Sequence, residues 1–261
     1  MKKELQIFLT AIMFYTRLPV PGWIDHGEEL LNKATRYFPL IGWIVGGFTA
    51  GVFYGCLYVF PLSIALLFSI TSGILLTGAF HEDGFADFCD AFGGGWSKEK
   101  ILAIMKDSRI GVFGAAGLLL ILLFKFFSLS ALPSFLIIKI ILLAHVVSRY
   151  SATLFIFTSQ YVRENDDSKA KPVGKKLATK DFFVASIFGL LPFLLFPWHF
   201  ILILIPMAIC FWWFRRYLHK WIGGYTGDCL GAIQQVQEVV VYLSVIVLIN
   251  FELSAGQITI F

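Results

Sequence analysis

Long apolar runs separated by shorter polar segments make up most of this 261-residue chain. Seven runs are long enough, or nearly so, to cross a bilayer as helices. They lie at residues 37–60, 62–80, 110–127, 135–157, 182–197, 199–214 and 238–253. We expect helices because backbone groups in lipid must be satisfied within the segment, and no alternating β-barrel pattern is present. The weakest pair, 182–197 and 199–214, is also compatible with a helical hairpin that enters the membrane only in part.

A shorter apolar stretch, from Leu5 to Tyr15, follows Lys2 and Lys3. At about 11 residues it is too short to span a bilayer, and it lacks the small-residue cleavage site of a signal peptide. We therefore expect an interfacial or re-entrant helix. The whole pattern predicts an all-α fold with a single domain over residues 1–261. This domain is a polytopic membrane helical bundle of about seven transmembrane helices, with an N-terminal interfacial helix and a cytoplasmic acidic helix.

The composition supports a membrane protein, and the placement of its charges predicts which side of the membrane each connecting segment faces. Hydrophobic residues make up 58% of the chain and charged residues only 15%, whereas about a quarter of the residues are charged in soluble domains. Of the 21 Lys and Arg residues, 18 fall in segments 1–36, 81–109, 158–181 and 215–237. Seven spans place these four segments on one side, which the positive-inside rule makes cytoplasmic, with the C-terminus outside. The net charge of +4 therefore reports topology and contact with the lipid bilayer, not nucleic-acid binding.

Three basic residues lie within the predicted spans: Lys125, Lys139 and Arg149. Lys125 is near enough to the end of its span for its ammonium group to reach the interface. His145 and Arg149 are four residues apart, so they share one face of a helix. Ionisable groups inside a membrane usually face a bundle interior, so this pair favours a polar cavity between the helices.

Carboxylates are concentrated in the segment from His81 to Asp90, which holds Glu82, Asp83, Asp87 and Asp90. The three Asp residues are spaced i, i+4 and i+7, so on a helix they share a face and repel one another. A divalent cation would offset that repulsion, and all-oxygen ligands favour Mg²⁺. We expect the helix to begin near Glu82 and to end at Gly93-Gly94-Gly95. A solvated acidic face is the alternative, but the spacing, the glycines and the basic run that follows favour metal binding.

Two other segments offer ligand-binding groups. The run Lys106-Asp107-Ser108-Arg109 precedes a predicted span. An arginine fork and the free amides of a helix N-terminus suit phosphate oxygens, although a positive-inside anchor explains the run equally well. The segment 223–232 is rich in glycine and contains Asp228. Close approach of its backbone to a ligand and a flexible turn are both compatible with this composition.

Together these motifs resemble the cobalamin synthase family, the adenosylcobinamide-GDP ribazoletransferases. The matching segments occur in the family's order and are Arg17–Pro21, Arg36–Gly42, His81–Asp87, Met105–Gly111 and Gly224–Asp228. The resemblance implies a transferase that joins α-ribazole, or its 5′-phosphate, to adenosylcobinamide-GDP. The product would be adenosylcobalamin or its 5′-phosphate, with release of GMP. It also implies a bacterial or archaeal cytoplasmic (inner) membrane and an active site that faces the cytoplasm.

The resemblance further implies roles for individual residues. Mg²⁺ is the expected cofactor, because attack of a ribose hydroxyl on a pyrophosphate depends on positioning and charge neutralisation. Its expected ligands are Glu82, Asp83, Asp87 and Asp90. The expected catalytic residues are Lys106, Asp107 and Arg109, and the expected substrate-binding residues are Arg17, Arg36, Ser108, Gly227 and Asp228. The two small-molecule substrates and the bilayer are the expected partners, and homo-oligomerisation is left open.

Two other classes of protein share part of the pattern. A CDP-alcohol phosphotransferase-like lipid enzyme also uses an Asp-rich helix, but its pattern needs Arg after Ala, and here Ala86 is followed by Asp87. A cation transporter would place acidic residues inside its spans. In this chain Glu238 and Glu252 are the only acidic residues that lie outside the four charged segments. Both classes are therefore less consistent with the sequence than ribazole transfer.

Overall fold

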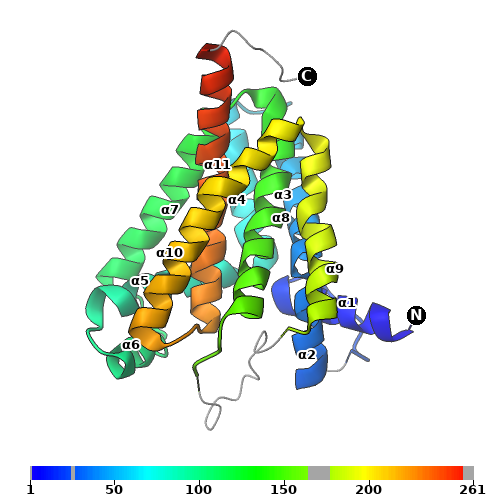
Figure 1. Cartoon of the computed structure of the whole chain (residues 1–261). Coiled ribbons are helices and arrows are strands. Elements are labelled where there is room, and N and C mark those ends of the chain that lie inside the picture. The colour runs from blue at the N-terminus through cyan, green and yellow to red at the C-terminus, as the bar shows by residue number, and fades with distance from the viewer. Residues whose placement is uncertain (1, 25–26, 164–176, 255–261) are drawn as a thin grey trace.

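The computed structural model describes residues 2–24, 27–163 and 177–254 as an all-α protein, as predicted. Figure 1 shows most of the helices running side by side as a bundle. These helices are α3 (Phe38–Cys56), α4 (Leu62–Thr77), α7 (Val112–Ser130), α8 (Ser134–Thr158), α9 (Thr179–Leu190), α10 (Leu204–Ile222) and α11 (Gly227–Ser254). The other elements are α1 (Lys2–Tyr15), α2 (Glu28–Ala34), η1 (Thr35–Tyr37), α5 (Phe80–Gly94), α6 (Lys98–Ile104), η2 (Leu191–Leu195) and η3 (Trp198–Ile203).

Five helical segments in the described residues are long and apolar enough to cross a membrane, which makes this an integral membrane protein. They are Glu29–Cys56, Val112–Ser130, Ser134–Thr158, Trp198–Ile222 and Gly227–Glu252. The pair α4–α5, bent by 89°, adds a sixth if it is counted as one broken span.

The predicted count of seven is not confirmed, because residues 182–197 do not form one long helix. The 12-residue α9 stops where Pro192 enters the 3-10 turn η2. Proline has no amide hydrogen to continue an α-helix, and 12 residues rise only about 18 Å, against the roughly 30 Å of a bilayer core. The chain nevertheless passes along the bundle through α9 and returns through α10 (Figure 1).

The basic segments gather at one end of the bundle. In Figure 1 this lower end holds α1, α2, α5, α6, the start of α9 and the connection between α10 and α11. The connections α3–α4, α7–α8 and η2–η3 lie at the opposite end, together with the described end of α11. Residues 164–176, most of the charged segment 158–181, lie outside the described residues. The arrangement of the remaining parts agrees with the one-sided charge distribution that the sequence predicts.

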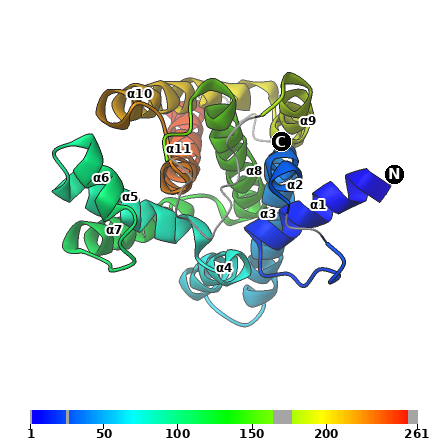
Figure 2. The same cartoon turned by 90° about the horizontal axis from the view of Figure 1, so that it is seen from below.

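Two helices cross the charged end instead of following the bundle. Figures 1 and 2 show α1 and α5 lying across it. α5 leaves α4 through Gly78 and Ala79, whose φ angles are +66° and +57°. Glycine is needed at the first of these positions, because the backbone is left-handed and a Cβ there would collide with the guanidinium of Arg17. α4 therefore runs along the bundle, whereas the acidic helix α5 lies across its charged end and stops at Gly94, within the predicted glycine triplet.

Candidate active site

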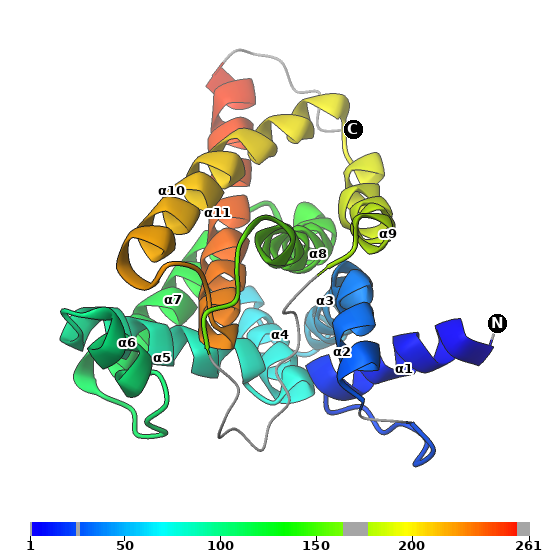
Figure 3. The same cartoon turned by 60° about the horizontal axis from the view of Figure 1, so that its bottom comes forward.

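Three carboxylates from two distant parts of the sequence meet at the charged end. Asp83 and Asp87 lie on α5, and Asp228 lies in the first turn of α11. Figure 3 shows α5 passing alongside the start of α11. The two helices approach so closely that a Cβ on Gly84 would lie 3.0 Å from the Cα of Asp228. The predicted acidic helix thus exists, and its partner is the glycine-rich segment that the sequence analysis treated separately.

The carboxylates of this cluster repel one another, and Arg163 offsets only part of that repulsion. Burial raises the pKa of Asp87 to about 7, and the like charges of Asp228 and Asp83 add to the shift, while Arg163 acts in the opposite direction. Among the described residues, no three carboxylate, imidazole or thiol groups form a ready-made metal cage. The donor set still fits a hard cation, because these oxygens repel one another and a divalent ion would remove that repulsion.

Asp90, predicted as a further metal ligand, has another role in the structure. Its two carboxylate oxygens accept hydrogen bonds from the backbone amides of Gly111 (2.7 Å) and Gly114 (2.8 Å). These amides belong to the start of α7, where a helix has unpaired donors and favours a negative charge. Asp90 therefore caps α7 and anchors the loop that precedes it to the acidic helix, so both of its carboxylate oxygens are already engaged.

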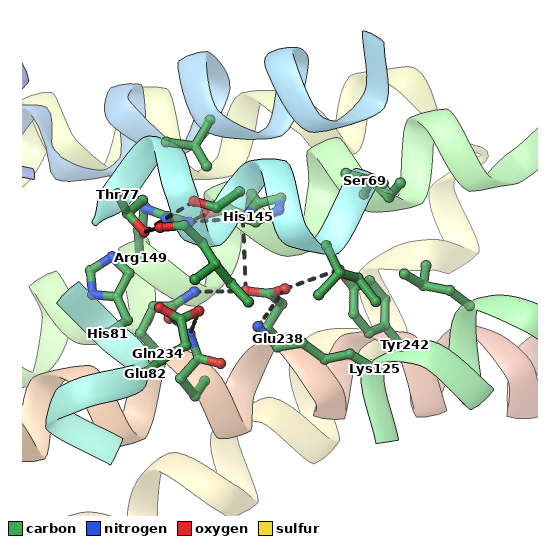
Figure 4. Close-up of a pocket in the computed structure, with 17 residues that line it drawn as sticks. Ser69, Thr77, His81, Glu82, Lys125, His145, Arg149, Gln234, Glu238 and Tyr242 are labelled. Atoms are coloured by element: carbon green, nitrogen blue, oxygen red, sulfur yellow. Dashed lines mark hydrogen bonds and ion pairs between the residues drawn. The ribbon is translucent and has the colours of Figure 1, made fainter. Parts of the chain in front are cut away.

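Glu82, the other predicted ligand, points away from Asp83. Its side chain is buried, and its Oε1 accepts a hydrogen bond of 2.9 Å from the amide of Gln235 on α11. Figure 4 shows Glu82 on the wall of a cavity inside the bundle. Neighbouring residues on a helix point about 100° apart, so Asp83 faces the charged end while Glu82 faces the interior. The four predicted ligands therefore do not converge on one point.

Arg163 is a site residue that the sequence analysis missed. Its Nη2 donates to Oδ2 of Asp228 (2.7 Å) and to the backbone carbonyl of Met105 (3.1 Å). The residue is held in place by a short parallel bridge, in which the amide of Val162 donates to the carbonyl of Tyr225 (3.0 Å). A basic residue just beyond a span was the only signal in the sequence, and it did not connect Arg163 to a partner 65 residues away.

The predicted catalytic loop, Lys106 to Arg109, lies beside the carboxylates. Arg163 contacts Met105 at one end of it, and Asp90 anchors Gly111 at the other. Within the loop, Nη2 of Arg109 donates to Oδ2 of Asp107 (2.7 Å), and this hydrogen bond lowers the pKa of Asp107 to about 2. Lys106, Ser108 and Arg109 are exposed, and the Arg109 side chain is 86% accessible. These groups are free to meet a soluble ligand, so their assignment to catalysis and substrate binding stays a prediction.

The remaining predicted substrate-binding residues differ in their surroundings. The guanidinium of Arg36 is largely buried and forms ion pairs with Asp181 (2.8 Å) and with Glu4, so it joins η1 to α9 and α1. It is therefore committed to structural contacts. Arg17 is exposed next to Gly78 at the bend between α4 and α5. Gly227 has open space where a side chain would be, directly before Asp228. Arg17 and Gly227 thus remain accessible to a ligand.

The chain has well-described relatives over nearly its whole length. A family model described as cobalamin-5-phosphate synthase matches residues 7–247. The adenosylcobinamide-GDP ribazoletransferase of Leptospira interrogans is 43% identical over 257 residues, which cover 95% of this chain and 97% of the relative. Proteins of the same name from Shewanella amazonensis and Vibrio cholerae are 42% and 39% identical and cover 95% and 97% of this chain, with 97% of each relative covered. No solved structure matches. This chain belongs to the cobalamin-5-phosphate synthase family.

Proposed function

We propose that this membrane transferase forms the nucleotide loop of cobalamin with the help of Mg²⁺ at the cytoplasmic face of the membrane. It would transfer the phosphocobinamide part of adenosylcobinamide-GDP to α-ribazole, or to α-ribazole 5′-phosphate, and release GMP. The observation that carries the Mg²⁺ and orientation parts of this proposal is the meeting of Asp83, Asp87, Asp228 and Arg163 at the charged end of the bundle. The family match supports the reaction, and it disfavours the lipid-enzyme and transporter alternatives.

In this proposal Asp83, Asp87 and Asp228 hold the metal. When bound, Mg²⁺ would supply positive charge that stabilises the transition state of phosphoryl-type transfer. Arg163 binds and orients the pyrophosphate, since a guanidinium presents a planar fork to phosphate oxygens. The exposed side chains of Lys106, Ser108 and Arg109 provide further donors on the same side. Asp107 orients Arg109 through the ion pair between them.

The decisive experiment uses the full-length protein, purified and reconstituted into nanodiscs. Adenosylcobinamide-GDP would be incubated with α-ribazole or its 5′-phosphate, with and without Mg²⁺, and GMP release would be followed. We expect release only when both substrates and Mg²⁺ are present. Equal release after chelation of divalent ions would refute the metal part of the proposal while leaving the transferase activity in place.

Substituting Arg163 by Lys should reduce GMP release by roughly a hundredfold, the scale of losing one transition-state donor. The charge beside Asp228 is retained, but the planar guanidinium, whose Nη2 donates to both Asp228 and the Met105 carbonyl, is lost. Steady-state kinetics in both substrates would measure the effect. Arg215→Lys is the matched control, because Arg215 donates to the carbonyl of Thr158 at the same end and contacts none of the three carboxylates in the described residues. Equal kinetics for the two variants would remove Arg163 from the site.

The Mg²⁺ requirement should depend on pH. With the pKa of Asp87 raised to about 7, this carboxyl carries a proton at lower pH and must lose it before it can bind metal. The Mg²⁺ concentration for half-maximal activity should therefore fall as the pH rises, by up to about tenfold per unit below pH 7, and level off above it. Mg²⁺ titrations between about pH 6 and pH 8 would measure this slope. A requirement that does not change over this range would contradict the role of Asp87.

Reporter fusions test the orientation. Fusions after Gly95 and Tyr225 should report the cytoplasm, because both positions lie at the end of the bundle that holds the basic segments. Fusions after Pro61 and Ala131, at the opposite end, should report the exterior and serve as the matched controls. A cytoplasmic signal at Ala131, or an exterior signal at Gly95, would overturn the proposed topology.

A further inference from the structure

A polar cavity of about 30 Å³ lies inside the bundle, between α4, α5, α7, α8 and α11. Figure 4 shows ionisable side chains from four of these helices turned toward it: Glu82, Lys125, His145, Arg149 and Glu238. Lys125, Arg149, Glu82 and Glu238 are nearly or fully buried. The expectation of a polar cavity at His145 and Arg149 is confirmed. The expectation that Lys125 reaches the membrane interface is wrong, because its side chain is buried in this cavity.

The charges in this cavity balance. Nζ of Lys125 lies 3.0 Å from Oε1 of Glu238, and the hydroxyl of Tyr242 donates to the same oxygen (3.1 Å). Arg149 donates to the carbonyl of His145 (2.9 Å) and lies near Nδ1 of that ring (3.1 Å). Two carboxylates thus face two permanent cations, so the cavity has no excess charge with which to attract a further ion.

An unbroken line of hydrogen bonds connects the cavity to the acidic helix. Nε2 of Gln235 donates to Oε1 of Glu82 (2.9 Å) and to the side-chain oxygen Oε1 of Gln234 (2.9 Å). Gln234 in turn donates to Oε2 of Glu238 (2.8 Å), whose other oxygen pairs with Lys125. Glu82 is therefore the point at which α5 is joined to a buried network that involves α7, α8 and α11.

Several buried atoms at the cavity lack a protein partner within the described part of the chain: Nε2 of His81, Oε2 of Glu82, Nε of Arg149 and Oε1 of Gln235. Leaving such atoms unsatisfied is costly in a medium of low dielectric constant. The cavity has room for one or two water molecules, which need about 10–15 Å³ each. Water can donate to the carboxylate and amide oxygens and accept from the guanidinium, so it suits this set better than a cation.

The hydrogen bond between Gln235 and Glu82 lies next to the place where α5 crosses α11. At that crossing, Gly84 lies against the backbone of Asp228, and a Cβ on Gly231 would lie 3.0 Å from the carbonyl of His81. Gln235 is one turn beyond Gly231, and Glu82 is next to Asp83. The crossing of α5 and α11 is thus fixed by two contacts: the Glu82–Gln235 hydrogen bond on the side of the cavity, and the close approach of Gly84 to Asp228 on the side of the charged end.

We propose that Glu82 is a positioning residue and not a metal ligand. Its carboxylate, held by Gln235, sets the rotation of α5 on α11. In this way it places Asp83 and Asp87 opposite Asp228. The inference rests on the proposed Mg²⁺ role of those three carboxylates.

Three variants separate this role from the alternatives: Glu82→Ala, Glu82→Gln and Gln235→Leu. Glu82→Ala and Gln235→Leu remove the hydrogen bond between these two side chains. Both variants should raise the Mg²⁺ concentration for half-maximal GMP release by roughly tenfold or more, as loss of a residue that orients a metal ligand does. Glu82→Gln keeps the oxygen that accepts from Gln235 and should restore the wild-type Mg²⁺ requirement, even where thermal stability falls. Asp83→Asn serves as the control for direct loss of a ligand.

Two results would overturn the inference. An equal increase for Glu82→Gln and Glu82→Ala would make Glu82 a metal ligand. A wild-type Mg²⁺ requirement in Glu82→Ala and Gln235→Leu, with lower melting temperatures, would make the contact merely structural.

A second measurement does not depend on turnover. Spin labels at positions 96 and 243, just beyond the end of α5 and on α11, replace exposed side chains in a background without native cysteines. The distance distribution between them should broaden in Glu82→Ala and Gln235→Leu but not in Glu82→Gln. Unchanged distributions in all three variants would refute the positioning role. If the wild type releases GMP without Mg²⁺, the proposed metal function fails, and the distance measurement still decides the role of Glu82.

Discussion

Replacing Asp83 by Ala should lower GMP release by roughly a thousandfold or more, because several kcal/mol of transition-state stabilisation would be lost with the metal ligand. Asp87→Ala should have a loss of the same order, since the two side chains and Asp228 share one cluster. Asp83 is exposed, so membrane insertion should be unaffected. Turnover at saturating substrate and Mg²⁺, together with the amount of folded protein, would be measured.

Glu99→Ala provides the matched control for these variants. Glu99 lies on α6 at the same end, is exposed, and its removal changes the net charge by the same amount. Its turnover should stay close to that of the wild type. If Asp83→Ala kept near-wild-type turnover, Asp83 would have no part in the mechanism, and the Mg²⁺ site would have to be sought elsewhere.

The second large effect is on stability and involves Lys125. Lys125→Met removes the cation 3.0 Å from the buried Glu238 carboxylate and leaves that charge inside the bundle without its closest cationic partner. Breaking a buried ion pair in this way costs about 3–5 kcal/mol. Glu238→Gln alone should destabilise the fold by a similar route, because it leaves the ammonium group unpaired. Thermal unfolding of the purified variants would measure both losses.

The double variant Lys125→Met/Glu238→Gln tests whether the two charges are coupled. Removing both charges together restores the balance, so the double variant should be more stable than either single variant. Lys139→Met is the matched control, since Lys139 is exposed on α8 and no ion pair is described for it. If the losses of stability in the two single variants simply add in the double variant, the charges of Lys125 and Glu238 are not coupled.

Local patterns in the sequence were sufficient to predict most of the helices. The apolar runs predicted α3, α4, α7 and α8 to within a few residues, because burial in lipid selects continuous apolar segments of known length. The glycine triplet likewise predicted the end of α5 at Gly94. The weak segment 182–197 was overestimated, since a hydropathy pattern does not show that Pro192 interrupts the helix after α9.

The candidate site was predictable only in part. The acidic helix and the reactive loop were evident from spacing and charge. The sequence did not show which acidic residues face the site and which face the interior. Glu82 and Asp83 are neighbours in sequence, and the rotation of α5 against α11 decides which of them is buried. The same is true of Asp90, whose role as a cap depends on where α7 begins.

By itself, the sequence of this protein determined the class of fold, the side of the bundle that carries the charged segments, and the motifs by which the family is recognised. These properties depend on composition and on residues within a few turns of one another. Only the tertiary structure decided which charges are partners: Arg163 with Asp228, Lys125 with Glu238, and Glu82 with Gln235. Each of these pairs joins residues at least 65 positions apart. Their contact depends on how helices pack across the bundle, which no local pattern specifies.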